Sequence, residues 1–128
     1  MKQIKSLSDK RIIVTAKLNG MNANLLVDTG ATVAILSDRI RRKYKLSLGR
    51  DYHLPIVGAG GDFDAKYCNT PAYIEDKPLT QFLIADIGNI VDSVERETGI
   101  EIQGIISLPQ MQFAGIRIDT RNNTIIID

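Results

Sequence analysis

The sequence predicts a protein of the all-β class, mainly β with one or two short helices. Short runs of aliphatic and β-branched residues recur along the chain, and turn signals such as Asn19-Gly20 and Asn122-Asn123 separate them. At 128 residues the chain is long enough for a hydrophobic core but too short for two domains. We therefore expect a single domain over residues 1–128, with residues 1–10 as a candidate flexible N-terminal arm.

The first expected element is a β-hairpin near the N-terminus. Residues 12–18 alternate between two sets of side chains, a pattern typical of a half-buried strand. Asn19-Gly20 follows directly and is the strongest short-range signal for a hairpin turn. Residues 21–27 are apolar enough to return as the partner strand.

The stretch NLLVDTGATVAILS, residues 24–37, places the acid Asp28 where an apolar strand ends. A carboxylate in that position loses hydration unless hydrogen-bond donors or a partner charge receive it. Gly30 allows the backbone to turn sharply, and Thr29 offers a hydroxyl beside the acid. The stretch therefore predicts a carboxylate on a tight turn between two strands, the second strand at residues 32–36.

The middle of the chain predicts a short helix and two further pairs of strands. Ser37 is a suitable N-cap for the helix that follows it. A glycine-rich tip, residues 58–61, separates two extended arms. The expected elements are a helix at Asp38–Lys45, arms at Tyr52–Val57 and Asp62–Cys68, and a strand pair at residues 72–75 and 79–85 across Asp76-Lys77-Pro78.

The last third of the chain predicts a strand, a short helix and a final hairpin. Residues 87–99 are acidic and have an ambiguous pattern, which we interpret as a loop with a turn of helix that ends at Gly99. The elements expected after them are a strand at residues 102–106, a short helix at residues 108–113, and a hairpin of residues 116–119 with 124–127.

The composition narrows the class of protein. The net charge of +1 supplies no field that would favour nucleic acid or a membrane surface. The single cysteine, Cys68, excludes an internal disulfide and fits a reducing compartment. The start of the chain has no apolar core typical of a signal peptide, and no segment has the apolar length of a membrane span. We therefore expect a cytoplasmic protein.

A basic run and two reactive residue types have ordinary interpretations. The run RIRRKYK, residues 39–45, suits a solvated helix face better than a nucleic-acid site, because acids elsewhere balance the charge. His53 has no evident partner in the sequence pattern. Cys68 has no nearby histidine to activate it, so we interpret it as a small core residue. No nucleic-acid or membrane partner is expected.

Four segments of the chain occur in an order found in one family. They are LLVDTGATVAIL, residues 25–36; IVGAGGDF, residues 56–63; IQGIISLPQM, residues 102–111; and IRIDTRNNTIII, residues 116–127. Together they resemble the active-site segment, the flap, the later hydrophobic-hydrophobic-Gly segment and the closing hairpin of retropepsin-like aspartic proteases. The resemblance covers residues 11–128 and implies a closed acid-protease barrel. Ser107 departs from it, since the family usually has glycine there, and Pro109 replaces a frequent polar residue.

The resemblance implies an aspartic-type endopeptidase, a hydrolase that acts on peptide or protein substrates. The catalytic residues would be Asp28, Thr29 and Gly30. Substrate would lie between the active-site turn and the flap tip, and the chemistry needs no metal and no organic cofactor. The implied substrate-binding residues are Ala31, Val57, Gly58, Ala59, Gly60 and Gly61.

The number of Asp-Thr-Gly motifs predicts a homodimer. Hydrolysis by carboxylates needs one group that takes a proton from water and another that gives one to the carbonyl oxygen. This chain has one such motif, and none of its other acids repeats the pattern of apolar strand, acid and Thr-Gly. A two-fold dimer would bring two copies of Asp28 together, and the resemblance implies the same assembly.

The motif has three other interpretations. An Asp-Thr-Gly can be an Asx-type turn without chemistry. The same fold can serve as a catalytically silent peptide-binding or dimerisation module. A phosphoryl-acceptor aspartate needs a doubly wound α/β domain, for which this strand-rich chain is a poor host. The glycines at residues 58–61 are not a phosphate loop, because no Gly-Lys-Ser/Thr follows.

Overall fold

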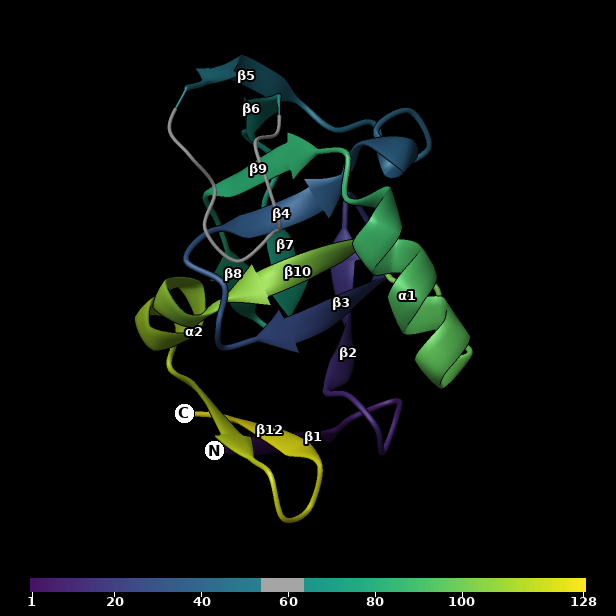
Figure 1. Ribbon diagram of the computed structural model, residues 1–128. Coiled ribbons are helices and arrows are strands. Elements are labelled where there is room, and N and C mark those ends of the chain that lie inside the picture. The colour runs from purple at the N-terminus through teal and green to yellow at the C-terminus, as the bar shows by residue number, and fades with distance from the viewer. Residues whose placement is uncertain (54–63) are drawn as a thin grey trace.

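A computed structural model describes residues 1–53 and 64–128 of the chain and shows a mainly β architecture (Figure 1). Its helices are α1 (Gly88–Thr98) and α2 (Leu108–Ala114), with a short 3-10 helix at Asp38–Ile40. The strands are β1 (Lys2–Lys5), β2 (Ile13–Leu18), β3 (Met21–Asp28), β4 (Ala34–Ser37), β5 (Leu48–Tyr52), β6 (Ala65–Cys68), β7 (Ala72–Ile74), β8 (Lys77–Leu79), β9 (Phe82–Ala85), β10 (Gly104–Ser107), β11 (Ile116–Asp119) and β12 (Thr124–Ile127).

The strands form two sheets of different size. The larger has the order β5-β6-β9-β4-β10-β3-β2-β7-β8, and the smaller has the order β1-β12-β11. Strand β10 is inserted between β3, to which it is parallel, and β4, to which it is antiparallel. The late segment of the chain therefore lies beside the strand that carries Asp28. The small sheet holds both termini and lies at one end of the molecule (Figure 1).

The central strands of the larger sheet are buried on both faces. Successive residues of one strand enter different clusters of the core: Leu25 and Leu26 of β3, like Ile105 and Ile106 of β10, lie on opposite sides. Continuous apolar runs are typical of strands covered on both faces. Helix α1 covers one face with residues that include Val91 and Val94.

The structure confirms the predicted class, mostly β with two short helices. The hairpin of β2 and β3 turns at Asn19-Gly20, whose φ angles of 50° and 79° are those that Asn-Gly favours in hairpins. The last hairpin and helix α2 also lie where the sequence predicts them. Closure of the barrel is not seen, because no pairing joins the end strands β5 and β8 within the described residues.

The predicted pairing of residues 72–75 with 79–85 is wrong. Strand β7 pairs with β8 through a tighter turn at Glu75-Asp76, so that Ile74 lies opposite Lys77. Glu75 takes a left-handed conformation with φ 55°, which the sequence pattern does not indicate. Strand β9 then separates from β8 at Gln81, φ 65°, and inserts between β6 and β4.

One predicted helix is shorter than expected, and the ambiguous segment at residues 87–99 is more helical than expected. The helix expected at Asp38–Lys45 is shorter, because only Asp38–Ile40 form a regular 3-10 turn before irregular turns that lead to Lys45, φ 53°. Ser37 caps it as predicted, accepting the Arg39 N–H at 3.2 Å. Residues 87–99 instead form the full helix α1, which ends at the left-handed Gly99.

The N-terminal residues contain a strand, and only part of the predicted arms lies within the described residues. Within the expected N-terminal arm, Lys2–Lys5 form β1 and pair with β12. Of the predicted arms, the second contains β6, whereas the first shares only Tyr52 with β5, which begins earlier, at Leu48. The two strands pair with a register shift between Leu48 and Asp51. Residues 54–63, which include the glycine-rich tip, lie outside the described residues.

Candidate active site

Asp28 is the last residue of β3, and the neighbouring strands fix its position. Strand β2 pairs with β3 on one side and β10 on the other, where Ser107 lies in register with Asp28. The side chains of Leu25 and Leu26 anchor β3 in the core on both faces of the sheet. The buried strand therefore holds the half-exposed Asp28 at a defined edge of the core.

The turn after Asp28 is closed by two hydrogen bonds. The Ala31 N–H donates to the Asp28 carbonyl oxygen at 3.1 Å, and the Gly30 N–H donates to Asp28 Oδ1 at 3.0 Å. The second bond is an Asx-type contact, and it orients the carboxylate. Thr29 and Gly30 are exposed at the tip of the turn, whereas Ala31 is buried.

Gly30 is not required here for a left-handed backbone, since its φ lies outside that region. A Cβ added at Gly30 would lie 3.4 Å from Asp28 Oδ1, an ordinary contact within one chain. The sharp turn that the sequence suggested for this glycine is therefore made without unusual backbone angles. Its role in the described structure is to donate its N–H to the carboxylate.

The turn is tied to helix α2. The Leu108 N–H donates to the Ala31 carbonyl oxygen at 3.3 Å, so the first residue of the helix holds the end of the turn. Ser107 caps the same helix, accepting the Gln110 N–H on its hydroxyl at 3.3 Å. The end of β3 and the start of α2, far apart in the sequence, thus lie side by side (Figure 1).

Apolar residues that follow the Asp28 turn pack on one face of the larger sheet. Ala31 packs in the same buried cluster as Leu26, Ile35 and Ile105. Val33, shortly after the turn, packs against this cluster and lines an open cleft of about 890 Å³ together with residues of β5, β6 and β9. The lining combines apolar and aromatic side chains with a few polar ones, a mixture typical of ligand-binding clefts.

The structure brings together some of the predicted site residues. Asp28, Thr29, Gly30 and Ala31 form the turn just described. The other predicted substrate-binding residues, Val57, Gly58, Ala59, Gly60 and Gly61, lie outside the described residues. The cleft also has lining residues that the sequence did not single out, among them Arg50 and Tyr67. The sequence gives little indication of these two residues, because an arginine and a tyrosine on different strands form no recognisable motif.

None of the helices within residues 1–53 and 64–128 combines the length and the apolar character needed to cross a lipid bilayer. The helices cover the sheet and support the turn instead. Val91 and Val94 of α1 pack into the core, and Met111 of α2 is buried.

Comparison with known proteins gives a consistent result. A family model described as aspartyl protease matches residues 14–109. A comparison with curated protein sequences gives no match. Among solved structures, EIAV protease in complex with the inhibitor HBY-793 matches with a TM-score of 0.63 at 22% identity, covering 91% of this chain and 99% of that one.

Two cellular structures are similar in the same way. The retroviral protease-like domain of Ddi1 from Leishmania major matches with a TM-score of 0.60 at 18% identity, covering 92% of this chain and 88% of that one. A retropepsin-like aspartic protease from Rickettsia conorii matches with a TM-score of 0.58 at 19% identity, covering 98% of this chain and 88% of that one. These likenesses show the fold, and the family model covers the segment with the Asp28 turn. The chain therefore belongs to the aspartyl protease family, and its fold is that of retropepsin-like proteases.

Proposed function

We propose that the protein is an aspartic endopeptidase that hydrolyses peptide bonds as a homodimer. Two copies of Asp28, one from each subunit, would hold and activate the attacking water. The observation that carries the proposal is the position of Asp28, on a hydrogen-bonded turn at the end of a buried strand, within a chain of this family.

The chemistry requires two carboxyl groups in different protonation states. One takes a proton from water while the other gives a proton to the carbonyl oxygen of the substrate. Two carboxyls a few ångströms apart share one proton, because charging both is costly. A two-fold dimer with Asp28 at its axis meets this requirement with one Asp-Thr-Gly per chain.

The neighbouring residues have supporting roles in this proposal. Thr29, exposed beside Asp28, would hydrogen-bond across the dimer axis and fix the two turns relative to each other. The Gly30 N–H holds the carboxylate from its own chain at 3.0 Å. Ala31 would border the bound peptide, and Val57, Gly58, Ala59, Gly60 and Gly61 would cover it. The substrate would bind as an extended strand, with main-chain hydrogen bonds.

The direct test is the substitution Asp28→Asn. Asparagine is nearly isosteric with aspartate but cannot act as the acid or the base, so we expect no hydrolysis of a mixed peptide library. Cleavage is followed by mass spectrometry, and the dimer by analytical ultracentrifugation. Asp76→Asn is the matched control, since Asp76 is an exposed acid in the β7–β8 turn. Full activity in a clean Asp28→Asn preparation would remove the mechanism.

A second candidate function rests on Ser107. This buried residue lies in register with Asp28 where the family usually has glycine. A protein of the same fold that binds peptides or dimerises without turnover would tolerate such a change beside the carboxylate. Saturable peptide binding by the wild-type dimer, with no cleavage over a wide pH range, would favour this candidate.

A further inference from the structure

The cleft that Val33 borders has a distinctive far wall. It continues across β9 and β6 to β5, and its lining includes Leu83, Tyr67 and Arg50. Tyr67 and Leu83 lie directly opposite each other on β6 and β9. Since Leu83 shares the buried cluster of Ala31, this wall and the active-site turn belong to the same face of the sheet.

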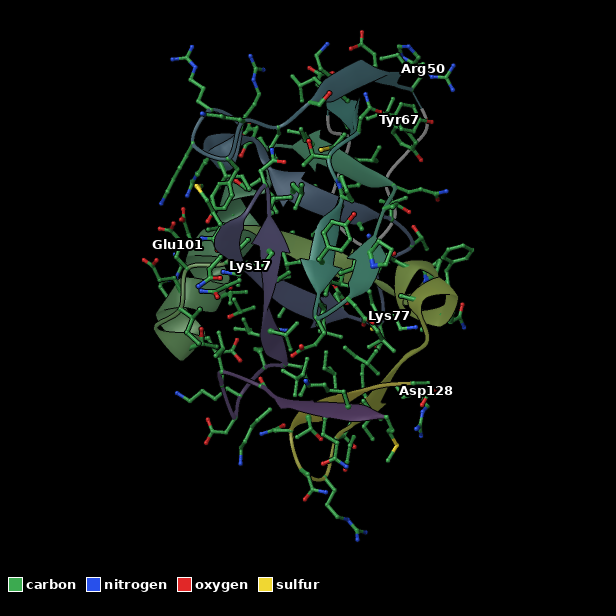
Figure 2. All side chains as sticks on the ribbon, turned by 180° about the vertical axis from the view of Figure 1, so that it is seen from behind. Lys17, Arg50, Tyr67, Lys77, Glu101 and Asp128 are labelled. Atoms are coloured by element: carbon green, nitrogen blue, oxygen red, sulfur yellow. The ribbon has the colours of Figure 1, made fainter. Side chains whose placement is uncertain are left out.

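A local irregularity places Arg50 above Tyr67. Leu48 lies opposite Cys68 and Asp51 opposite Lys66, so β5 carries one more residue than β6 between these pairs. Such a bulge changes the direction in which a side chain points. Arg50 Cζ accordingly lies 5.3 Å from the ring centroid of Tyr67, a cation–π distance. Figure 2 shows both side chains together at the β5 end of the molecule.

The ring beneath the guanidinium is itself held in place. Tyr52 meets Tyr67 edge to face, with centroids 5.5 Å apart and planes at 80°. Both tyrosines are half-buried and pack against the cluster that contains Leu83. An arginine supported in this way loses less side-chain freedom when its planar fork binds a ligand.

The charge of Arg50 has no partner among the ion pairs of residues 1–53 and 64–128. The described residues that line the cleft include no acid. The neighbouring Asp51 is occupied instead by Lys66, with its Oδ1 2.6 Å from Lys66 Nζ. The guanidinium is therefore exposed to the cleft with its donors available to a carboxylate, which it can bind through two parallel hydrogen bonds.

We infer that Arg50 and Tyr67 form a subsite for an acidic side chain, Asp or Glu, of the bound peptide. This inference rests on the proposed peptidase function, because Val33, which follows the Asp28 turn closely in the chain, lines the cleft. A peptide that extends from the turn along the cleft brings its more distant side chains to the β5 wall. Because each subunit of the proposed dimer supplies one Arg50, it is then a specificity-determining residue that selects substrates with an acid on either side of the cleaved bond.

The test is a positional scan of a cleaved peptide in which each residue is replaced in turn by Glu or Gln. At one position on each side of the cleaved bond we expect kcat/KM to be about three- to tenfold higher for Glu, the range expected for one partly exposed charged hydrogen-bonded pair. Arg50→Gln should reduce that Glu-to-Gln ratio to about one, and Arg50→Lys, which keeps charge but not the planar fork, should give an intermediate ratio. The matched control is Lys43→Gln, since Lys43 also lies over a ring, Tyr44, at 5.7 Å but outside the cleft; it should leave the ratio unchanged.

A binding measurement separates this inference from the proposed function. Labelled Glu and Gln peptides are titrated onto the Asp28→Asn protein, with and without the Arg50→Gln substitution. Cleavage of the same peptides is measured with the wild type and with Arg50→Gln alone. Cleavage without any Glu preference, or a preference that survives Arg50→Gln, would overturn the subsite and leave the peptidase intact. Arg50-dependent preference for Glu in binding, without turnover by the wild type, would overturn the peptidase and support the subsite. Absence of both cleavage and binding would overturn both.

Discussion

Ser107 lies in register with Asp28 on the adjacent parallel strand, and it is almost fully buried. Its hydroxyl accepts the Gln110 N–H and so caps helix α2, whose first residue also holds the Asp28 turn through the Ala31 carbonyl oxygen. The serine therefore serves a structural purpose beside the candidate active-site turn.

This contact predicts different effects for two substitutions. Ser107→Ala removes the cap and should lower the free energy of unfolding by about 1 kcal/mol, whereas Ser107→Gly should cost only a few tenths. Urea denaturation measures both. We expect kcat/KM of Ser107→Gly to stay within about twofold of the wild type, which corresponds to about 0.4 kcal/mol. A large gain in Ser107→Gly would show instead that the serine restrains the active site.

Substitution of Gly104 and of Gly99 should lower the free energy of unfolding for different reasons. A Cβ at Gly104 would lie 2.7 Å from Leu36 Cδ2 and 2.8 Å from the Ile35 carbonyl oxygen, at the centre of the sheet. Gly104→Ala should therefore cost about 1–3 kcal/mol through overpacking. Gly99 has open space around it but a φ of 76°, so Gly99→Ala should cost about 1 kcal/mol through backbone strain.

Asparagine distinguishes the two mechanisms, because it tolerates the left-handed conformation better than alanine does. In urea denaturation, Gly99→Asn should be more stable than Gly99→Ala, whereas Gly104→Asn should be less stable than Gly104→Ala. The same ranking at both positions would contradict this assignment of causes.

Tyr44 should make stability depend on pH in the alkaline range. Its buried hydroxyl donates to the Asn22 carbonyl oxygen at 2.6 Å, and burial together with the negative charge of Glu101 raises its pKa above the ordinary 10.0. The stabilisation is therefore complete below pH 10 and is lost as pH rises through the higher pKa of the folded state.

The substitution Tyr44→Phe tests this dependence. It should cost about 1 kcal/mol at pH 7, where one hydrogen bond is lost. The difference between the two proteins should then shrink as the pH rises above 10, because only the wild type loses this contribution. Urea midpoints measured from pH 7 to pH 11 give the comparison, and parallel curves would show that Tyr44 titrates alike in the folded and unfolded states.

The sequence predicted those elements that depend on neighbouring residues alone, such as the β2–β3 hairpin. Asn19-Gly20 specifies a hairpin because both residues accept positive φ, and the strand that ends at Asp28 follows from its apolar run. The β7–β8 turn was missed because Glu75 is an unusual residue for a left-handed position, held there by the surrounding sheet. Pairing of β9 with β4 and β6 is decided by the core, which local patterns do not describe.

The candidate site also has a part that the sequence predicts and a part that it does not. The Asp28 turn is contiguous in the chain, so its motif is visible in the sequence. The contact between Arg50 and Tyr67 depends on a bulge and on the pairing of two strands, and the contact between Ser107 and Asp28 depends on the insertion of β10. Such relationships arise from tertiary packing, and residue types alone do not reveal them.

The proposed active site uses Asp28 from two chains. Wild-type and Asp28→Asn chains are mixed in equal amounts, allowed to exchange fully, and assayed at a total concentration well above the dimer dissociation constant. Mass-labelled subunits confirm the exchange. Random pairing leaves roughly a quarter of the dimers with both aspartates, so specific activity should fall to about a quarter and depend quadratically on the wild-type fraction. Activity of about one half, with a linear dependence, would mean that each chain acts alone, and it would contradict the shared site.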